Sequence, residues 1–193
     1  PENLKKVNIV FVESDPILSA VRALGLPVIK AFGTDTDFFK PNPLVEKEIE
    51  YFYPATLSPW KRQSDIAYLG DKLLCVGTLQ PDGVEELEAC KANGVRIEQG
   101  YFAVQKILKY YQSAKNVIIP AVHGSERTVL EAMSCNILPT ILYPTINKRA
   151  YSYIKEFESS GLKSPREFVV KRYGHKQFAK QLLKGINQCL KSQ

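Results

Sequence analysis

Residues 123–131 form the part of the sequence best suited to bind an anion. They follow an apolar run at 117–122 that is typical of a buried strand, and they lead into an amphipathic stretch at 127–134 that is typical of a helix. The turn between the two contains Gly124 and Ser125. A turn of this kind exposes backbone N–H groups, and the helix dipole adds partial positive charge. The segment is therefore suited to bind a diphosphate.

Glu131 stands about one turn inside that helix. A carboxylate in this place can accept hydrogen bonds from two vicinal hydroxyls, such as those of ribose. The same residues also fit a surface helix with Ser125 as its N-cap and Glu131 in solvent. Taken alone, the segment leaves both interpretations open.

Asp35 and Asp37 have the Asp-x-Asp spacing that can hold a divalent metal against a sugar-nucleotide diphosphate. They equally fit a turn in which aspartate side chains accept hydrogen bonds from nearby backbone amides. The two histidines, His123 and His175, are too few for a His-rich metal site.

Short apolar runs alternate with amphipathic stretches along the chain. Strands are expected at 7–12, 27–32, 49–53, 72–76, 95–98, 117–122 and 138–143, and helices at 16–24, 61–69, 84–92, 102–114 and 127–134. This alternation predicts an α/β fold: a Rossmann-like, doubly wound parallel sheet of about six strands with helices on both faces. Ligands bind such sheets beyond the carboxyl ends of the strands, so the loops after Tyr53, Val76, Glu98 and Val122 are the expected site.

Composition excludes several classes of protein. Of the 193 residues, 45% are hydrophobic and 24% are charged, which is typical of a globular domain and not of a disordered chain. No apolar run approaches the roughly 20 residues of a membrane-spanning helix. The motifs GxGxxG, GxxxxGK[ST] and GxSxG do not occur, which disfavours dinucleotide oxidoreductases and P-loop NTPases. The four cysteines form no CxxC pair and are expected to be reduced thiols of a cytoplasmic protein.

Positive charge is concentrated near the end of the chain. The net charge is +6, yet residues 148–193 alone hold 11 basic and 3 acidic residues, a balance of +8. Such a segment can attract nucleic acid, anionic lipid or a phosphorylated ligand, or can be a solvated helix surface. Within it, Phe178, Leu182, Ile186 and Leu190 have helical spacing and predict core contacts of a terminal helix.

Seven segments in a fixed order carry a family resemblance. They are residues 7–14 with the following helix, Phe-Gly-Thr-Asp-Thr-Asp-Phe-Phe-Lys-Pro at 32–41, Tyr-Pro-Ala-Thr-Leu-Ser-Pro-Trp-Lys at 53–61, Leu-Cys-Val-Gly at 74–77, Gly-Tyr at 100–101, the Ala-to-Pro segment 114–120, and Leu-Glu-Ala-Met-Ser-Cys at 130–135, which Leu-Pro-Thr follows at 138–140. Together they resemble the C-terminal, donor-binding domain of the group 1 glycosyltransferases, which have the two-domain GT-B fold. The resemblance implies that residues 1–42 are the end of an N-terminal domain with the interdomain segment. Residues 43–193 would then be the Rossmann-like nucleotide-sugar-binding domain, including the C-terminal helices.

The resemblance also implies donor-binding residues. The second glutamate of the family's pattern of two glutamates separated by seven residues matches Glu131, and the phosphate-binding lysine matches Lys61. The first glutamate position holds His123 instead, with Glu126 three places later. The resemblance also implies that Asp35 and its neighbours belong to an interdomain linker and do not bind a metal.

A second departure concerns the family's diphosphate-binding arginine, whose position holds Thr56. Arg127 or Arg62 would have to supply that charge, because threonine cannot replace a guanidinium group. Tyr101 lies where the family has a turn near the base; it can stack on the base or cover the sheet edge. The expected donor-binding residues are Thr56, Lys61, Tyr101, His123, Gly124, Ser125, Glu126, Arg127, Thr128 and Glu131.

The expected function is therefore that of the donor-binding domain of a metal-independent hexosyltransferase. It would bind a nucleoside diphosphate sugar as substrate, without a cofactor, for transfer to a hydroxyl acceptor. Catalytic residues stay unassigned, and this fragment is expected to be inactive without its N-terminal acceptor domain. A cytoplasmic location follows, with peripheral contact to a membrane or another anionic surface as an option for the basic segment.

Two alternatives belong to other classes. His123 and Thr56 suggest a catalytically silent nucleotide-sugar-binding or scaffold domain. The basic segment suggests a nucleic-acid-binding α/β domain, although it lacks interleaved aromatic residues and any recognised nucleic-acid motif.

Overall fold

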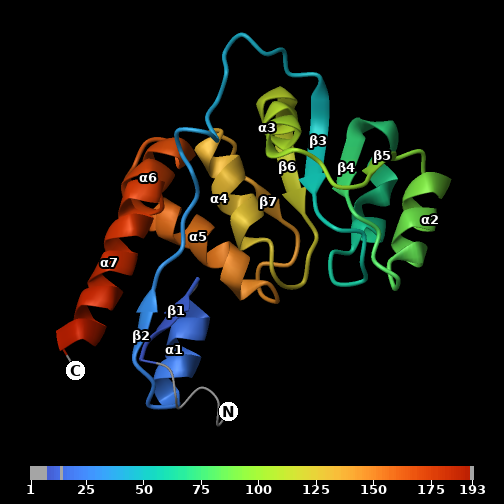
Figure 1. Ribbon diagram of the computed structural model, residues 1–193. Helices are drawn as coiled ribbons and strands as arrows, with labels where there is room; N and C mark the ends of the chain where they lie inside the picture. The colour runs from blue at the N-terminus through green and yellow to red at the C-terminus, as the bar shows by residue number, and fades with distance from the viewer. Residues whose placement is uncertain (1–7, 14, 192–193) are drawn as a thin grey trace.

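Five strands form the main sheet: β3 (Ile49–Pro54), β4 (Leu73–Gly77), β5 (Arg96–Gln99), β6 (Ala114–Ile119) and β7 (Thr140–Ile141). The computed structural model describes residues 8–13 and 15–191. Across the sheet the order is β5-β4-β3-β6-β7 (Figure 1). Every neighbouring pair is parallel, so the carboxyl ends of all five strands lie at one edge.

The core lies on both faces of this sheet, which explains the uninterrupted apolar run of β4 and the consecutive buried residues in β3 and β6. Phe52 and Tyr53 are consecutive in β3 and therefore point to opposite faces, yet both are fully buried. Phe52 packs edge-on against Tyr111, with ring centroids 5.2 Å apart. The strand β6 ends at Ile119, three residues before the predicted end, because Pro120 has no N–H for a further ladder bond.

Helical segments join the strands: η2 (Gln63–Lys72), α2 (Val84–Ala92), α3 (Val104–Ser113) and α4 (Glu126–Ser134). In contact with the sheet, α3 packs on β3 and β6, and α2 packs on β5 and η2. The repeated strand–helix–strand order confirms the predicted α/β, Rossmann-like fold. The helix expected at 61–69 is instead a 3-10 helix, and its regular geometry is interrupted at Gly70 (φ 59°, ψ −138°).

A smaller unit contains the described N-terminal residues. Strands β1 (Val10–Val12) and β2 (Val28–Lys30) form a separate two-stranded parallel sheet, joined by α1 (Asp15–Ala23). In the described part of the chain, seven strands therefore form two sheets, where the sequence predicted one sheet of about six. Residue 7, where the first strand was expected to begin, lies outside the described residues.

Three helices follow the main sheet: α5 (Lys148–Ser159), α6 (Pro165–Arg172) and α7 (His175–Lys191). The last of them returns to the small sheet and packs on β2 (Figure 1). The approach is close: a Cβ on Gly185 would lie 2.6 Å from the ring of Phe11, so a larger residue would force that ring to move. The domain boundary predicted between residues 42 and 43 stays a prediction.

The outer side of α7 differs from the sequence prediction. Phe178 and Leu182 are half-buried, as expected for contact residues. Ile186 and Leu190 are 48% and 64% exposed, so their predicted core role is wrong. The cause is geometric, because a two-stranded sheet is too narrow to cover the whole apolar side of the helix. In the described part of the chain, no helix is long and apolar enough to cross a membrane.

Candidate functional site

Three loops meet at the carboxyl edge of the main sheet, following β3, β6 and β7. The amide of Val122 donates to the carbonyl of Trp60 (3.1 Å) and joins the first two loops. The side-chain amide of Asn147 donates to the carbonyls of Ala121 (2.9 Å) and Gly124 (3.0 Å) and ties in the third loop. The turn that precedes α4 is therefore held from two sides.

Lys61 reaches from the first loop into this turn. Its Nζ donates to Oγ of Ser125 at 3.1 Å. A Cβ on Gly124 would lie 3.0 Å from that Nζ and would push it aside, and the left-handed φ of Gly124, +75°, favours glycine. Burial lowers the pKa of Lys61, and the carboxylate of Glu126 opposes this shift. Within the described ranges Lys61 forms no salt bridge, so the turn holds a partly desolvated ammonium that favours an anion.

The start of α4 offers unpaired backbone donors beside this ammonium. Ser125 occupies the N-cap position with φ 72°, but its side chain makes no capping hydrogen bond, because Oγ faces Lys61. The first amides of a helix have no partner inside the helix. In residues 8–13 and 15–191, no acceptor is found for the amides of Glu126, Arg127 and Thr128. The anion-binding interpretation of the turn therefore fits better than the capped surface helix.

Glu131 lies deeper, on the side of α4 that faces α3. It is half-buried, and its Oε2 accepts a hydrogen bond from the hydroxyl of Tyr111 at 3.1 Å. Burial raises the pKa of Glu131 to about 7, although Tyr111 and Arg127 both favour the ionised form. With about 1.5 Å of rise per residue, its backbone stands roughly 7 Å from the start of the helix. Glu131 is thus neither on the outer face nor directly at the turn.

Glu126 forms an ion pair with Arg149. Its side chain is 6% exposed, and Oε1 lies 2.6 Å from Nε of Arg149 in α5. Arg149 also pairs with Glu13, which follows β1. Two ion pairs therefore connect the start of α4, through Arg149, to the residue that follows β1.

The other expected residues are spread more widely. His123 packs against Trp60 with ring centroids 5.2 Å apart. The side chain of Thr56 is half-buried, and its carbonyl accepts from Nε2 of Gln63 at 2.8 Å. Tyr101 is 97% exposed.

The two arginines considered as substitutes for the family's arginine differ. Arg127 is exposed in the first turn of α4, beside the unpaired amides. Arg62 pairs with Asp65 at 2.7 Å and stacks on the ring of Tyr143 at 5.0 Å. Arg127 is therefore the better placed of the two.

The Asp-x-Asp segment forms a turn. Oδ1 of Asp35 accepts hydrogen bonds from the amides of Asp37 and Phe38, each at 3.0 Å. Among the described residues, no group of three or more His, Cys, Asp or Glu side chains could hold a metal ion.

Sequence reasoning missed three residues that shape the site: Tyr111, Asn147 and Arg149. Asn147 stands directly before an amphipathic stretch, which marks it as a candidate N-cap. Its bonds to two loop carbonyls, and the partners of Tyr111 and Arg149, depend on contacts distant in sequence and leave no local signal.

Comparison with known proteins identifies the fold. Neither a protein-family model nor a curated protein sequence matches the chain. Among solved structures, HepE from Anabaena, solved with UDP and glucose, superposes with a TM-score of 0.69 at 15% identity over 96% of this chain. The chain spans 64% of the HepE chain.

Two further solved structures share this fold at lower TM-scores. The C-terminal domain of a group 1 family glycosyltransferase, LpcC from Francisella tularensis, has a TM-score of 0.54 at 14% identity, over 74% of this chain and 100% of that domain. The N-terminal domain of trehalose-6-phosphate phosphatase from Candida albicans has a TM-score of 0.61 at 12% identity, over 95% of this chain and 58% of that chain. The chain thus has the Rossmann-like fold of the C-terminal half of a GT-B glycosyltransferase.

Proposed function

We propose that the chain is the donor-binding half of a glycosyltransferase, which binds a nucleoside diphosphate sugar for transfer of a hexose to a hydroxyl acceptor. One observation carries the proposal: unpaired amides of α4 and the ammonium of Lys61 converge at the turn around Ser125. Oriented donors of this kind stabilise the charge that develops on a diphosphate leaving group. Lysine and backbone amides supply this charge without a metal ion.

In this account the nucleotide extends from the turn along α4. The diphosphate lies against the amides of residues 126–128, with Lys61 and Arg127 as counter-charges. The ribose hydroxyls donate to Glu131, which retains Oε1 for this purpose while Oε2 accepts from Tyr111. Because the pKa of Glu131 is raised to about 7, this part of the binding energy increases as the pH rises through neutrality.

A thermal-shift screen tests donor binding, because a ligand that binds the folded state stabilises it by mass action. UDP, GDP and ADP are added to the chain, with uridine, guanosine and adenosine as controls without phosphate. We expect one diphosphate to raise the melting temperature and its nucleoside to have little effect. No response to any diphosphate contradicts the proposal.

A catalytically silent nucleotide-sugar-binding module is the second candidate. His123 in the first acidic position and Thr56 in the arginine position favour it, and the fold also occurs in a chain named a phosphatase. Release of labelled sugar from a donor, measured with the chain joined to an N-terminal acceptor domain, separates the two. The silent module binds the donor and releases no sugar.

Location and partners are further parts of the proposal. All four cysteines are free thiols, which suits the reducing cytoplasm. An N-terminal acceptor domain would complete the small sheet formed by β1 and β2. The nucleic-acid alternative is tested by measuring the affinity for an oligonucleotide at several salt concentrations. Binding that is strong at low salt and falls steeply towards physiological salt would favour this alternative.

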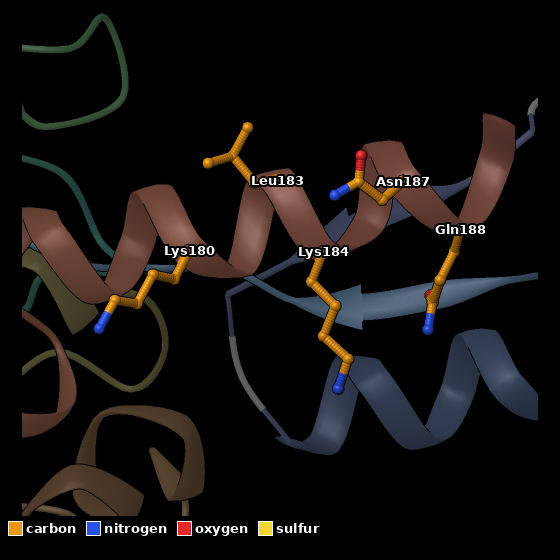
Figure 2. A pocket seen from close by; sticks show the side chains of 5 residues that line it. All are labelled: Lys180, Leu183, Lys184, Asn187 and Gln188. Atoms are coloured by element: carbon orange, nitrogen blue, oxygen red, sulfur yellow. The ribbon is translucent and has the colours of Figure 1, made fainter.

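The exposed face of α7 suggests contact with an anionic lipid surface. This α7 face comprises a pocket of about 420 Å³ lined by Lys180, Leu183, Lys184, Asn187 and Gln188 (Figure 2). Ile186 and Leu190 of the same helix are also exposed. The helix contains no acidic residue. Exposed leucines next to lysines are typical of helices that lie on membranes, where each lysine contributes roughly 1 kcal/mol near anionic lipid.

A further inference from the structure

Asn147 is a buried polar side chain that contacts the turn before α4. It is 1% exposed and stands at the N-cap of α5. Its amide nitrogen donates to the carbonyls of Ala121 (2.9 Å) and Gly124 (3.0 Å). Its Oδ1 accepts from the amide of Ala150 at 3.3 Å. Both N–H groups of the side chain and its oxygen therefore form hydrogen bonds, and the two N–H groups bond to carbonyls of the loop that precedes α4.

These bonds determine which way the peptide groups of the turn face. In a trans peptide the C=O and the following N–H point in opposite directions. The Ala121 peptide illustrates this, because its carbonyl faces Asn147 while the next amide, of Val122, donates to Trp60 on the other side. By the same geometry, the carbonyl of Gly124 faces Asn147 and the amide of Ser125 points away from α5.

The turn needs such support, because its backbone is strained. Gly124 and Ser125 are consecutive residues with left-handed φ values of +75° and 72°. A non-glycine residue in this region persists only where its surroundings hold it. Rotation of the peptide between the two would exchange the outward N–H for a carbonyl oxygen, which repels an anion.

We propose that Asn147 is a positioning residue that fixes the Gly124–Ser125 peptide with its N–H outward. The Ser125 amide then extends the row of donors formed by the amides of residues 126–128. The identity of the anion, a nucleoside diphosphate, rests on the proposed function; the orientation of the peptide does not.

Two substitutions separate this role from helix capping. Asn147→Ser and Asn147→Asp both retain an oxygen that can cap α5, and both remove the amide donors that hold the turn. We expect each to raise the dissociation constant of the best-binding diphosphate among UDP, GDP and ADP at least tenfold. The matched control is Ser164→Ala, which removes the cap of α6 and should change this constant less than twofold.

Amide NMR of the ligand-free protein supplies a readout that a capping role would not move. We expect Asn147→Ser to shift or broaden the amide signals of Gly124 and Ser125 and to leave α6 unchanged. Coincident Ser125 signals in variant and wild type, or equal affinities, overturn the proposal. If wild type binds none of the three diphosphates, the proposed function fails while the NMR comparison still decides the role of Asn147.

A measurement on the unaltered chain keeps the test independent of how the variants fold. Added inorganic pyrophosphate should move the Ser125 amide signal, and the side-chain NH₂ protons of Asn147 should exchange slowly with solvent throughout. Rapid exchange of those protons contradicts the proposal, whereas a Ser125 signal that does not respond to pyrophosphate contradicts the proposed function.

Discussion

Glu131→Gln is expected to change stability and nucleotide binding in opposite directions. Burial raises the pKa of Glu131 from 4.5 to about 7 in the folded protein. A carboxyl group whose pKa is higher in the folded than in the unfolded state stabilises folding when protonated and opposes it when ionised. The cost is therefore absent below the unfolded pKa of 4.5, grows as the pH rises, and is complete above a pH of about 7.

The size of the effect follows from the two pKa values. A pKa difference of one corresponds to about 1.4 kcal/mol, so the ionised Glu131 opposes folding by about 3 kcal/mol at pH 8. Glutamine is neutral at every pH and retains an oxygen to accept from the hydroxyl of Tyr111. For a chain of this size, the variant should melt about 6–12 °C above wild type at pH 8 and close to it at about pH 4.5.

Thermal unfolding of both proteins from pH 4.5 to pH 8 measures the first half of this prediction. Calorimetric titration with the responding diphosphate at pH 8 measures the second, where loss of the carboxylate should weaken binding about tenfold or more. The control is Glu88→Gln, an exposed carboxylate that pairs with Lys91 and should alter neither quantity. Melting temperatures with the same pH dependence in Glu131→Gln and wild type, or an unchanged affinity, would refute the reasoning.

Four further predictions concern other parts of the molecule. Lys61→Met should weaken diphosphate binding at least tenfold in calorimetry, whereas Lys115→Met, at an exposed ion pair, should not. Glu126→Gln removes the charge that faces Nε of Arg149, which keeps Glu13 as a second partner, and should lower the free energy of unfolding by about 1–3 kcal/mol; an unchanged urea midpoint would contradict a stabilising role of the ion pair. The isolated chain should transfer no sugar to an acceptor, and robust transfer by it would show that no further domain is needed. In flotation, liposomes with anionic lipid should carry the chain, and Lys180→Glu should reduce its recovery. Equal recovery with neutral liposomes would contradict a lipid-binding role of the α7 face and would favour contact with the acceptor domain instead.

Much of the main sheet could be predicted, because β4 and large parts of β3 and β6 are buried. The apolar runs at 49–53 and 72–76 lie between helices that cover both faces, so burial leaves a continuous signal in the sequence. The turn around Gly124 was predicted for a similar reason: a buried strand, a glycine and a helix start occur in immediate succession. Both features depend on neighbours in sequence.

The parts that could not be predicted depend on contacts distant in sequence. Glu126 has the same local pattern as a solvated first-turn glutamate, and its pairing with Arg149 arises only when α5 folds back on α4. The exposure of Ile186 and Leu190 depends on how little surface the small sheet offers. Helical periodicity reports an apolar face and does not report whether anything covers it.

The most direct test of the central claim is a crystal structure of the chain with the diphosphate that responds in the thermal-shift screen. We expect density for two phosphates within hydrogen-bonding distance of the amides of residues 125–128 and of Nζ of Lys61, with the ribose beside Glu131. Density for the nucleotide elsewhere, with these amides free and Lys61 still bonded to Ser125, would contradict it.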